Sequence, residues 1–250
     1  AARTAAESSR PVHGGRTYPP QREVRLVYDA LPERQRALKN APHLVRVLPF
    51  LIPVLSKDGL INPKIARALG TAMWMYDATG GARIGKLHQR IDKEAALAHM
   101  PTLRATNVAA AYLYYDAQTD DARYTLTLAR TAANHGAVLA NHTAVTKLRK
   151  GTDGRVSGAT VEADGRAFEI SARTVVNAAG VFSDEVREMD EGTHPHSIRP
   201  AKGISIPVPW EKVRNDLAAH VPVAKAGPPM LVGAWGVRPR RGPAVGDQRS

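Results

Sequence analysis

The chain has 250 residues, of which 43% are hydrophobic and 5% aromatic; it can bury one sizeable core or two modest ones, which excludes a disordered protein. It contains no cysteine, which excludes disulfides, thiolate metal sites and cysteine nucleophiles and agrees with a reducing compartment. The formal net charge of +12 suits an anionic partner, such as nucleic acid, an acidic membrane surface or a phosphorylated substrate.

The distribution of this charge argues against a dedicated nucleic-acid module. Arginines are spread over predicted helices and turns, without an aromatic-interleaved basic strand or zinc-ligand spacing. Their densest cluster lies after residue 227, in a Pro- and Gly-rich tail that we expect to be disordered. His88 and His99 have no partner at ligand spacing, so no metal site is predicted. The most apolar stretch, 44–55, is interrupted by Arg46 and two prolines, so neither a membrane span nor a signal peptide is predicted.

The first predicted helical stretch covers residues 21–39. Val24, Val27 and Leu31 make an apolar stripe, but Pro32 lies in the interior, which predicts two shorter helices. The arginines of this stretch form a solvated face, or a basic surface that touches anionic lipid.

Three elements are predicted between residues 44 and 116. The apolar runs and prolines of 44–54 indicate strand and loop, and 61–76 is helical. On that helix Met73, Trp74 and Tyr76 are expected to pack in the core, as aromatic residues at helical spacing usually do. Residues 109–116 fit a strand whose tyrosines are expected to pack as well.

The next helix begins near Asp120 and Asp121, whose carboxylates oppose the positive end of a helix dipole. From there an apolar stripe recurs at helical spacing, and Gly136 supplies a residue that can turn at the C-terminus. Residues 137–140 and 143–145 are short runs suited to a buried strand.

An antiparallel meander and a returning strand complete this region. Residues 155–162 and 166–171 face each other across Asp164-Gly165, a dipeptide that accepts the positive φ angles of a tight hairpin. Residues 174–180 then predict a strand with Val175 and Val176 buried and Gly180 at its end. Small residues at a strand end let the backbone approach a cofactor, although strand, glycine and helix recur throughout α/β proteins.

Five segments occur in the order seen in FAD-dependent glycerol-3-phosphate dehydrogenases. They are SSRPVHGGRTY (8–18), KNAPHLV (39–45), TDDAR (119–123), NAAG (177–180) and RPAKG (199–203). The chain resembles this family from about Ser8 to Val223. The resemblance implies an α/β fold: an FAD-binding domain of the glutathione-reductase-like, D-amino-acid-oxidase-like type, interleaved with an antiparallel-sheet substrate domain and incomplete here.

The resemblance also implies how the chain is divided. The expected parts are a partial FAD-binding segment (1–42), a substrate-domain segment (43–118), an FAD-binding segment with the meander (119–192), a second substrate-domain segment (193–226) and the disordered tail (227–250).

By the same resemblance, several residues are expected to contact FAD. Ser8 and Ser9 match serines near the flavin's phosphates, although by composition alone this is a flexible polar N-terminus. The stretch His13, Gly14, Gly15 matches a loop beside the isoalloxazine ring. The remaining expected cofactor contacts are Val145, Ala178, Ala179 and Gly180.

The substrate site departs from the family pattern. The family has HGGLRY where this chain has HGGRTY, so Thr17 occupies the place of a substrate-phosphate arginine and Arg16 lies one position early. A hydroxyl cannot offer the charged, bidentate fork that suits a phosphate. Tyr18 remains in register, and the resemblance makes Lys202 the candidate for an anion-stabilising charge. Arg16, Thr17 and Tyr18 are thus the expected substrate contacts, with Tyr18 and Lys202 as catalytic residues.

The implied reaction is oxidation of sn-glycerol 3-phosphate to dihydroxyacetone phosphate, with hydride passing to FAD and electrons then to a quinone. The implied location is cytoplasmic, with peripheral contact at the inner face of the cell membrane as an option. No nucleic-acid partner is expected, and the sequence does not indicate an oligomeric state.

The sequence also predicts that the chain as given is impaired. No G-x-G-x-x-G turn, which would hold the cofactor's pyrophosphate, follows a strand in the first hundred residues. The match ceases near Gly227, before the family's second substrate-binding arginine. With Thr17, these departures imply a chain without flavin or activity. The alternative functions are a non-catalytic remnant of such an enzyme and a basic anion-binding protein.

Overall fold

The computed structural model describes residues 11–12, 24–55, 63–79, 84–199, 204–221, 230–234 and 243–247. The chain forms two compact units. The larger consists of residues 7–124 and 202–250, and the smaller of residues 1–6 and 125–201.

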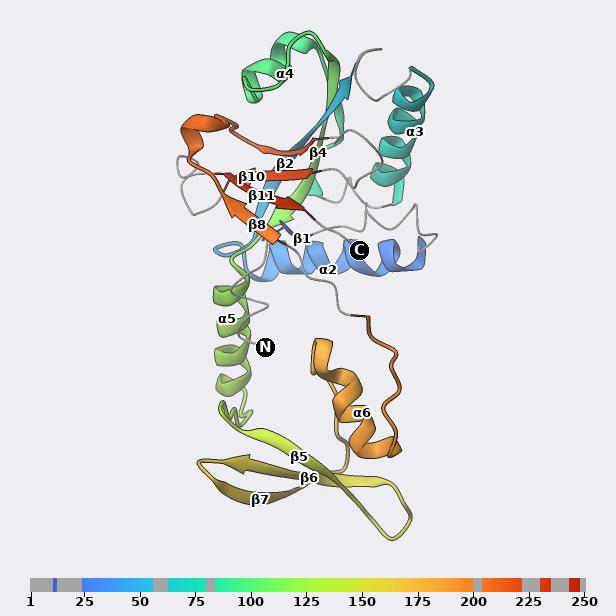
Figure 1. Ribbon diagram of the computed structural model, residues 1–250, viewed down its shortest axis with the longest axis vertical. Coiled ribbons are helices and arrows are strands. Elements are labelled where there is room, and N and C mark those ends of the chain that lie inside the picture. The colour runs from blue at the N-terminus through green and yellow to red at the C-terminus, as the bar shows by residue number, and fades with distance from the viewer. Residues whose placement is uncertain are drawn as a thin grey trace. The chain divides into compact units, whose positions relative to one another are not determined.

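The larger unit is built on an eight-stranded sheet in the order β1-β4-β2-β9-β10-β11-β8, with β3 also paired to β4. Of these strands, Figure 1 labels β1, β2, β4, β8, β10 and β11. The strands are β1 (Pro11–Val12), β2 (Arg46–Leu55), β3 (Gln89–Ile91), β4 (Val108–Gln118), β8 (Ile204–Pro207), β9 (Ala218–Val221), β10 (Met230–Ala234) and β11 (Pro243–Asp247). Only the β2–β9 pair of this described sheet is parallel. The β2–β4 ladder is long and runs from Arg46 opposite Gln118 to Leu55 opposite Val108.

Helices α2 (Val24–Asn40), α3 (Pro63–Thr79) and α4 (Lys93–His99) belong to this unit. The prediction of two short helices before residue 40 is wrong, because α2 runs unbroken through Pro32. Leu31 and Arg34 flank the proline and are both buried, so packing offsets the hydrogen bond that the proline removes. Helix α4 has an N-cap: Asp92 Oδ1 accepts a hydrogen bond of 2.8 Å from the Ala95 N–H.

Aromatic side chains form the centre of the core. Phe50 on β2 stacks on Tyr114 of β4 with ring centroids 5.1 Å apart, and Met73 and Tyr76 of α3 pack against this pair. The predicted core packing of Met73 and Tyr76 is confirmed. That of Trp74 is wrong, because its side chain is 63% exposed. One residue turns a helix by about 100°, which carries position 74 off the face that Met73 and Tyr76 bury.

The structure also differs from the expectation of a disordered tail after residue 227. Strand β10 pairs with both β9 and β11, and β11 pairs in turn with β8. Val232 of β10 is buried in the same cluster as Leu51 of β2. Sheet pairing therefore orders two segments whose composition alone favours disorder.

The smaller unit contains most of α5 (Asp121–Asn134) and a separate sheet in the order β5-β6-β7. Its other elements are β5 (Ala144–Lys150), β6 (Val156–Ala163), β7 (Arg166–Ser171), the 3-10 turn η3 (Gly180–Phe182) and α6 (Ser183–Glu191). The predicted helix and hairpin are confirmed: Asp164 and Gly165 have φ angles of 49° and 71°. Gly136, at φ 89°, turns the chain just beyond α5.

Helix α6 covers one face of this sheet (Figure 1). Its Val186 and Met189 pack against Leu148 of β5 and against Ala159 and Val161 of β6. This contact holds α6 on the meander.

Two predicted strands of this unit are wrong. Residues 137–140 and 174–177 are irregular, and Val175 and Val176, expected to be buried, are 37% and 80% exposed. Gly180, expected at a strand end, instead opens the turn η3. Within the described part of the chain neither segment pairs with another strand, and β-branched composition without a partner does not make a strand. No described helix is both long and apolar enough to cross a membrane.

Candidate functional site

The segment Asn177–Gly180 forms a small, exposed turn. The Asn177 side chain braces it: its Nδ2 donates to the Ser183 carbonyl at 2.9 Å, and its Oδ1 accepts the Ala179 N–H at 3.2 Å. Gly180 has φ 62°, and a Cβ there would meet no described atom within 4 Å. The turn thus presents backbone and methyl groups, with open space in front of its glycine.

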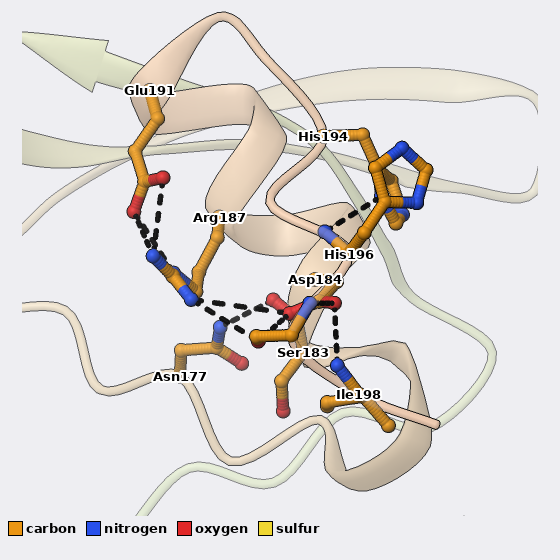
Figure 2. Close-up of polar contacts among 9 residues, drawn as sticks. Asn177, Ser183, Asp184, Arg187, Glu191, His194, His196 and Ile198 are labelled. Atoms are coloured by element: carbon orange, nitrogen blue, oxygen red, sulfur yellow. Dashed lines mark hydrogen bonds and ion pairs between the residues drawn. The ribbon is translucent and has the colours of Figure 1, made fainter. Parts of the chain in front are cut away.

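Asp184, in the first turn of α6, is 4% exposed and accepts three hydrogen bonds from the chain that returns after the helix (Figure 2). The Ser197 N–H and Oγ each donate at 2.6 Å, and the Ile198 N–H donates at 2.9 Å. A carboxylate that accepts several hydrogen bonds is stabilised in its charged form.

Charged neighbours surround this carboxylate. Arg187 Nη1 lies 4.0 Å from Asp184 Oδ1 and donates to Ser197 Oγ at 3.2 Å, while its Nε and Nη2 hold both oxygens of Glu191 (Figure 2). The His194 and His196 rings lie 4.3 Å apart.

The hydrogen bonds from Ser197 and Ile198 lower the pKa of Asp184, and the charge of His194 acts in the same direction. Because the pKa is lower in the folded state than in the unfolded state, this carboxylate stabilises the fold at neutral pH. That contribution is lost as the pH falls through the lowered pKa.

The structure describes only part of the expected site. It brings Ala178, Ala179 and Gly180 together in the one turn, whereas Val145 lies on β5 opposite Val161. The other expected residues lie outside the described part of the chain: Ser8, Ser9, His13, Gly14, Gly15, Arg16, Thr17, Tyr18 and Lys202.

Sequence reasoning missed the role of Asp184. No spacing rule signals that a carboxylate at 184 is buried against the backbone at 197–198. Among the residues that the structure describes, no cluster of three or more His, Asp or Glu side chains could hold a metal ion.

Residues 1–245 match the family model described as FAD dependent oxidoreductase. The chain belongs to this family. The α/β fold expected from the five segments is thereby confirmed, and the cofactor of the family is FAD.

Among its relatives, this FAD dependent oxidoreductase is 38% identical to the glycerol-3-phosphate dehydrogenase of Mycobacterium leprae over 236 residues, 93% of this chain and 39% of that protein. It is 35% identical to the human mitochondrial glycerol-3-phosphate dehydrogenase over 220 residues, 82% of this chain and 29% of that protein. The chain thus spans about two fifths or less of these relatives.

The solved structure of the glycerol-3-phosphate dehydrogenase from Bacillus halodurans, complexed with FAD, has a similar fold. Its TM-score is 0.68 at 21% identity, over 98% of this chain and 40% of that chain. This similarity supports the fold on its own, independently of the sequence matches.

The turn Ala178–Gly180 fits contact with a flavin cofactor. Its residues carry nothing larger than a methyl group, its surface is exposed, and the space beside Gly180 is open. The first turn of α6 already carries Asp184 and Glu185, which compensate the helix dipole and repel phosphate. The turn therefore suits an uncharged part of FAD better than its pyrophosphate.

Replacing Gly180 by valine should weaken FAD retention more than activity per bound flavin, because a branched side chain would fill the open space beside the turn. The measurement is flavin content per chain after gel filtration. Gly192→Val is the matched control, since Gly192 also has a positive φ, 76°, and open space around it. Equal flavin content in Gly180→Val and the parent would show that the cofactor does not use this space.

Proposed function

We propose that this chain serves FAD-dependent oxidation of sn-glycerol 3-phosphate to dihydroxyacetone phosphate, with a quinone as electron acceptor. The observation that carries the proposal is the 38% identity to a glycerol-3-phosphate dehydrogenase over 93% of the chain. The ordered segments from HGGRTY to RPAKG support it.

When bound, FAD would accept hydride from the substrate carbon and release electrons to the quinone. The chain's own residues would bind and orient the cofactor and the substrate. The turn Ala178–Gly180 offers the cofactor a surface free of large side chains. Lys202 offers a cation for negative charge, and Tyr18 offers a hydroxyl that can hydrogen-bond to the substrate.

The assay uses the chain with added FAD, sn-glycerol 3-phosphate and an artificial electron acceptor. Glycerol, which lacks the phosphate, is the matched control substrate. Turnover that requires both FAD and the phosphate supports the proposal. Stoichiometric flavin without any oxidation of sn-glycerol 3-phosphate would contradict the substrate, and absence of flavin binding would favour a non-catalytic protein.

Restoring the arginine of the family pattern with Thr17→Arg should lower the apparent KM for sn-glycerol 3-phosphate. A hydrogen bond to a charged group contributes roughly 1.5–3 kcal/mol, which corresponds to about a ten- to a hundredfold change in binding. Thr17→Gln, with a long neutral side chain, is the control. An unchanged KM in Thr17→Arg would mean that another group binds the phosphate.

We also propose cytoplasmic location with peripheral contact at an anionic membrane surface. Trp74 and Met75 of α3 are exposed, and Trp74 meets the His88 ring edge-on at 5.0 Å, next to the exposed Leu87 and Lys86. An aromatic and aliphatic surface beside a cation suits the lipid headgroup boundary, and the net charge of +12 favours anionic lipid.

The double variant Trp74→Ser/Met75→Ser should therefore co-sediment less with phosphatidylglycerol vesicles than the parent. Phosphatidylcholine vesicles supply the uncharged comparison. Leu128→Ser, at an exposed leucine of α5, is the control variant. Equal sedimentation of the double variant and the parent would place the contact elsewhere or nowhere.

A further inference from the structure

The first turn of α6 holds two segments that are distant in sequence (Figure 2). On one side the Ser183 carbonyl accepts the hydrogen bond from Asn177 that braces the turn 177–180. On the other side the Asp184 carboxylate accepts the hydrogen bonds from Ser197 and Ile198. Ser183 and Asp184 are neighbours, so a single helical turn connects both segments.

We propose that Asp184 is a positioning residue that couples the turn Asn177–Gly180 to the backbone at Ser197–Ile198. The proposal rests on the proposed function in one respect, that the turn contacts FAD. Residue 198 is followed directly by Arg199, the start of the RPAKG segment. Asp184 therefore fixes the end of one expected cofactor segment against the residues that directly precede the segment carrying Lys202.

The three donors explain why this position carries a carboxylate. Two backbone N–H groups and one hydroxyl converge on its two oxygens at 2.6 to 2.9 Å, and an ionised carboxylate suits them because both of its oxygens accept and neither carries a proton. Asparagine keeps the shape but offers one acceptor oxygen. Arg187 reinforces the arrangement, because it reaches both Asp184 and Ser197 while Glu191 holds its guanidinium.

The coupling can be tested without cofactor by hydrogen exchange of the chain, followed by mass spectrometry of peptides from 174–182 and 192–199. In Asp184→Asn we expect both peptides to exchange faster, by roughly tenfold or more, because local opening of the helix start frees both. Ser197→Ala removes one of the three hydrogen bonds and should act less strongly. Glu185→Gln removes an exposed carboxylate from the same helical turn and should leave both peptides unchanged.

Faster exchange in 192–199 alone would show that Asp184 holds only its own contact, and it would overturn the coupling. Unchanged exchange in both peptides would do the same.

The second measurement is FAD affinity, from quenching of flavin fluorescence. Asp184→Asn should weaken binding by roughly tenfold to a hundredfold, which corresponds to about 1.4–2.7 kcal/mol, while Glu185→Gln retains parental affinity. Parental affinity in Asp184→Asn would overturn the positioning role. If Asp184→Asn speeds the exchange of both peptides but the parent chain binds no FAD, the coupling is established and the proposed function is contradicted.

Discussion

Replacing Asp116 by asparagine should lower the free energy of unfolding of the larger unit by roughly 3–5 kcal/mol, the cost of leaving one member of a buried ion pair without its partner. Arg34 Nη1 lies 2.8 Å from Asp116 Oδ1, and the two side chains are 2% and 0% exposed. Arg34 also donates to the Tyr76 hydroxyl. The single neutral substitution therefore leaves a guanidinium in the core beside a weaker acceptor.

The guanidinium cannot escape this cost by losing its proton. An arginine guanidinium stays protonated in proteins. In the parent, burial opposes its charge, but the neighbouring Tyr76 and Asp116 more than compensate, so the pKa of Arg34 lies above its ordinary value. The measurement is urea unfolding of parent and variant followed by circular dichroism. An unchanged unfolding midpoint would mean that the pair contributes nothing.

A double variant separates the ion pair from simple packing. Arg34→Met/Asp116→Leu removes both charges together and should recover most of the stability that Asp116→Asn loses, since apolar replacement of a buried pair is often neutral or stabilising. If the double variant is as unstable as the single one, the loss comes from the shape of the site and not from an isolated charge.

The fold could be predicted where local signals agree with each other. The hairpin follows from Asp164-Gly165, because both residues adopt the positive φ that the dipeptide permits. Helix α5 follows from its carboxylate start and apolar stripe. Tertiary contacts decided the elements that sequence patterns missed. Helix α2 tolerates Pro32 because residues beside it are buried. Val176 is exposed because its segment has no described strand to pair with.

The candidate site likewise has one part that the sequence shows and one part that only tertiary contacts reveal. The small residues at 178–180 can be read from the sequence, and the structure places them in an exposed turn; their contact with the cofactor stays a prediction. Asp184 was invisible because its partners, at 197 and 198, lie beyond a helix and a loop. A side chain that hydrogen-bonds to the backbone cannot be recognised from the residue types around its partner, because every residue except proline offers the same N–H.

Gly158 illustrates a constraint that no sequence pattern announced, and Gly158→Ala should destabilise the smaller unit by roughly 2–4 kcal/mol. A Cβ at this position of β6 would lie 2.0 Å from the Ile170 carbonyl oxygen and 3.1 Å from the Ser171 Cα, both backbone atoms of β7. Rotation of a side chain cannot relieve such a clash, so the β6–β7 ladder must open.

Gly154→Ala is the control, since Gly154 has φ 76° and no described atom within 4 Å of its Cβ position, so it tests backbone strain alone. Thermal unfolding together with hydrogen exchange of 156–171 should show a larger loss in Gly158→Ala than in Gly154→Ala. Equal effects would mean that the two strands can separate without cost.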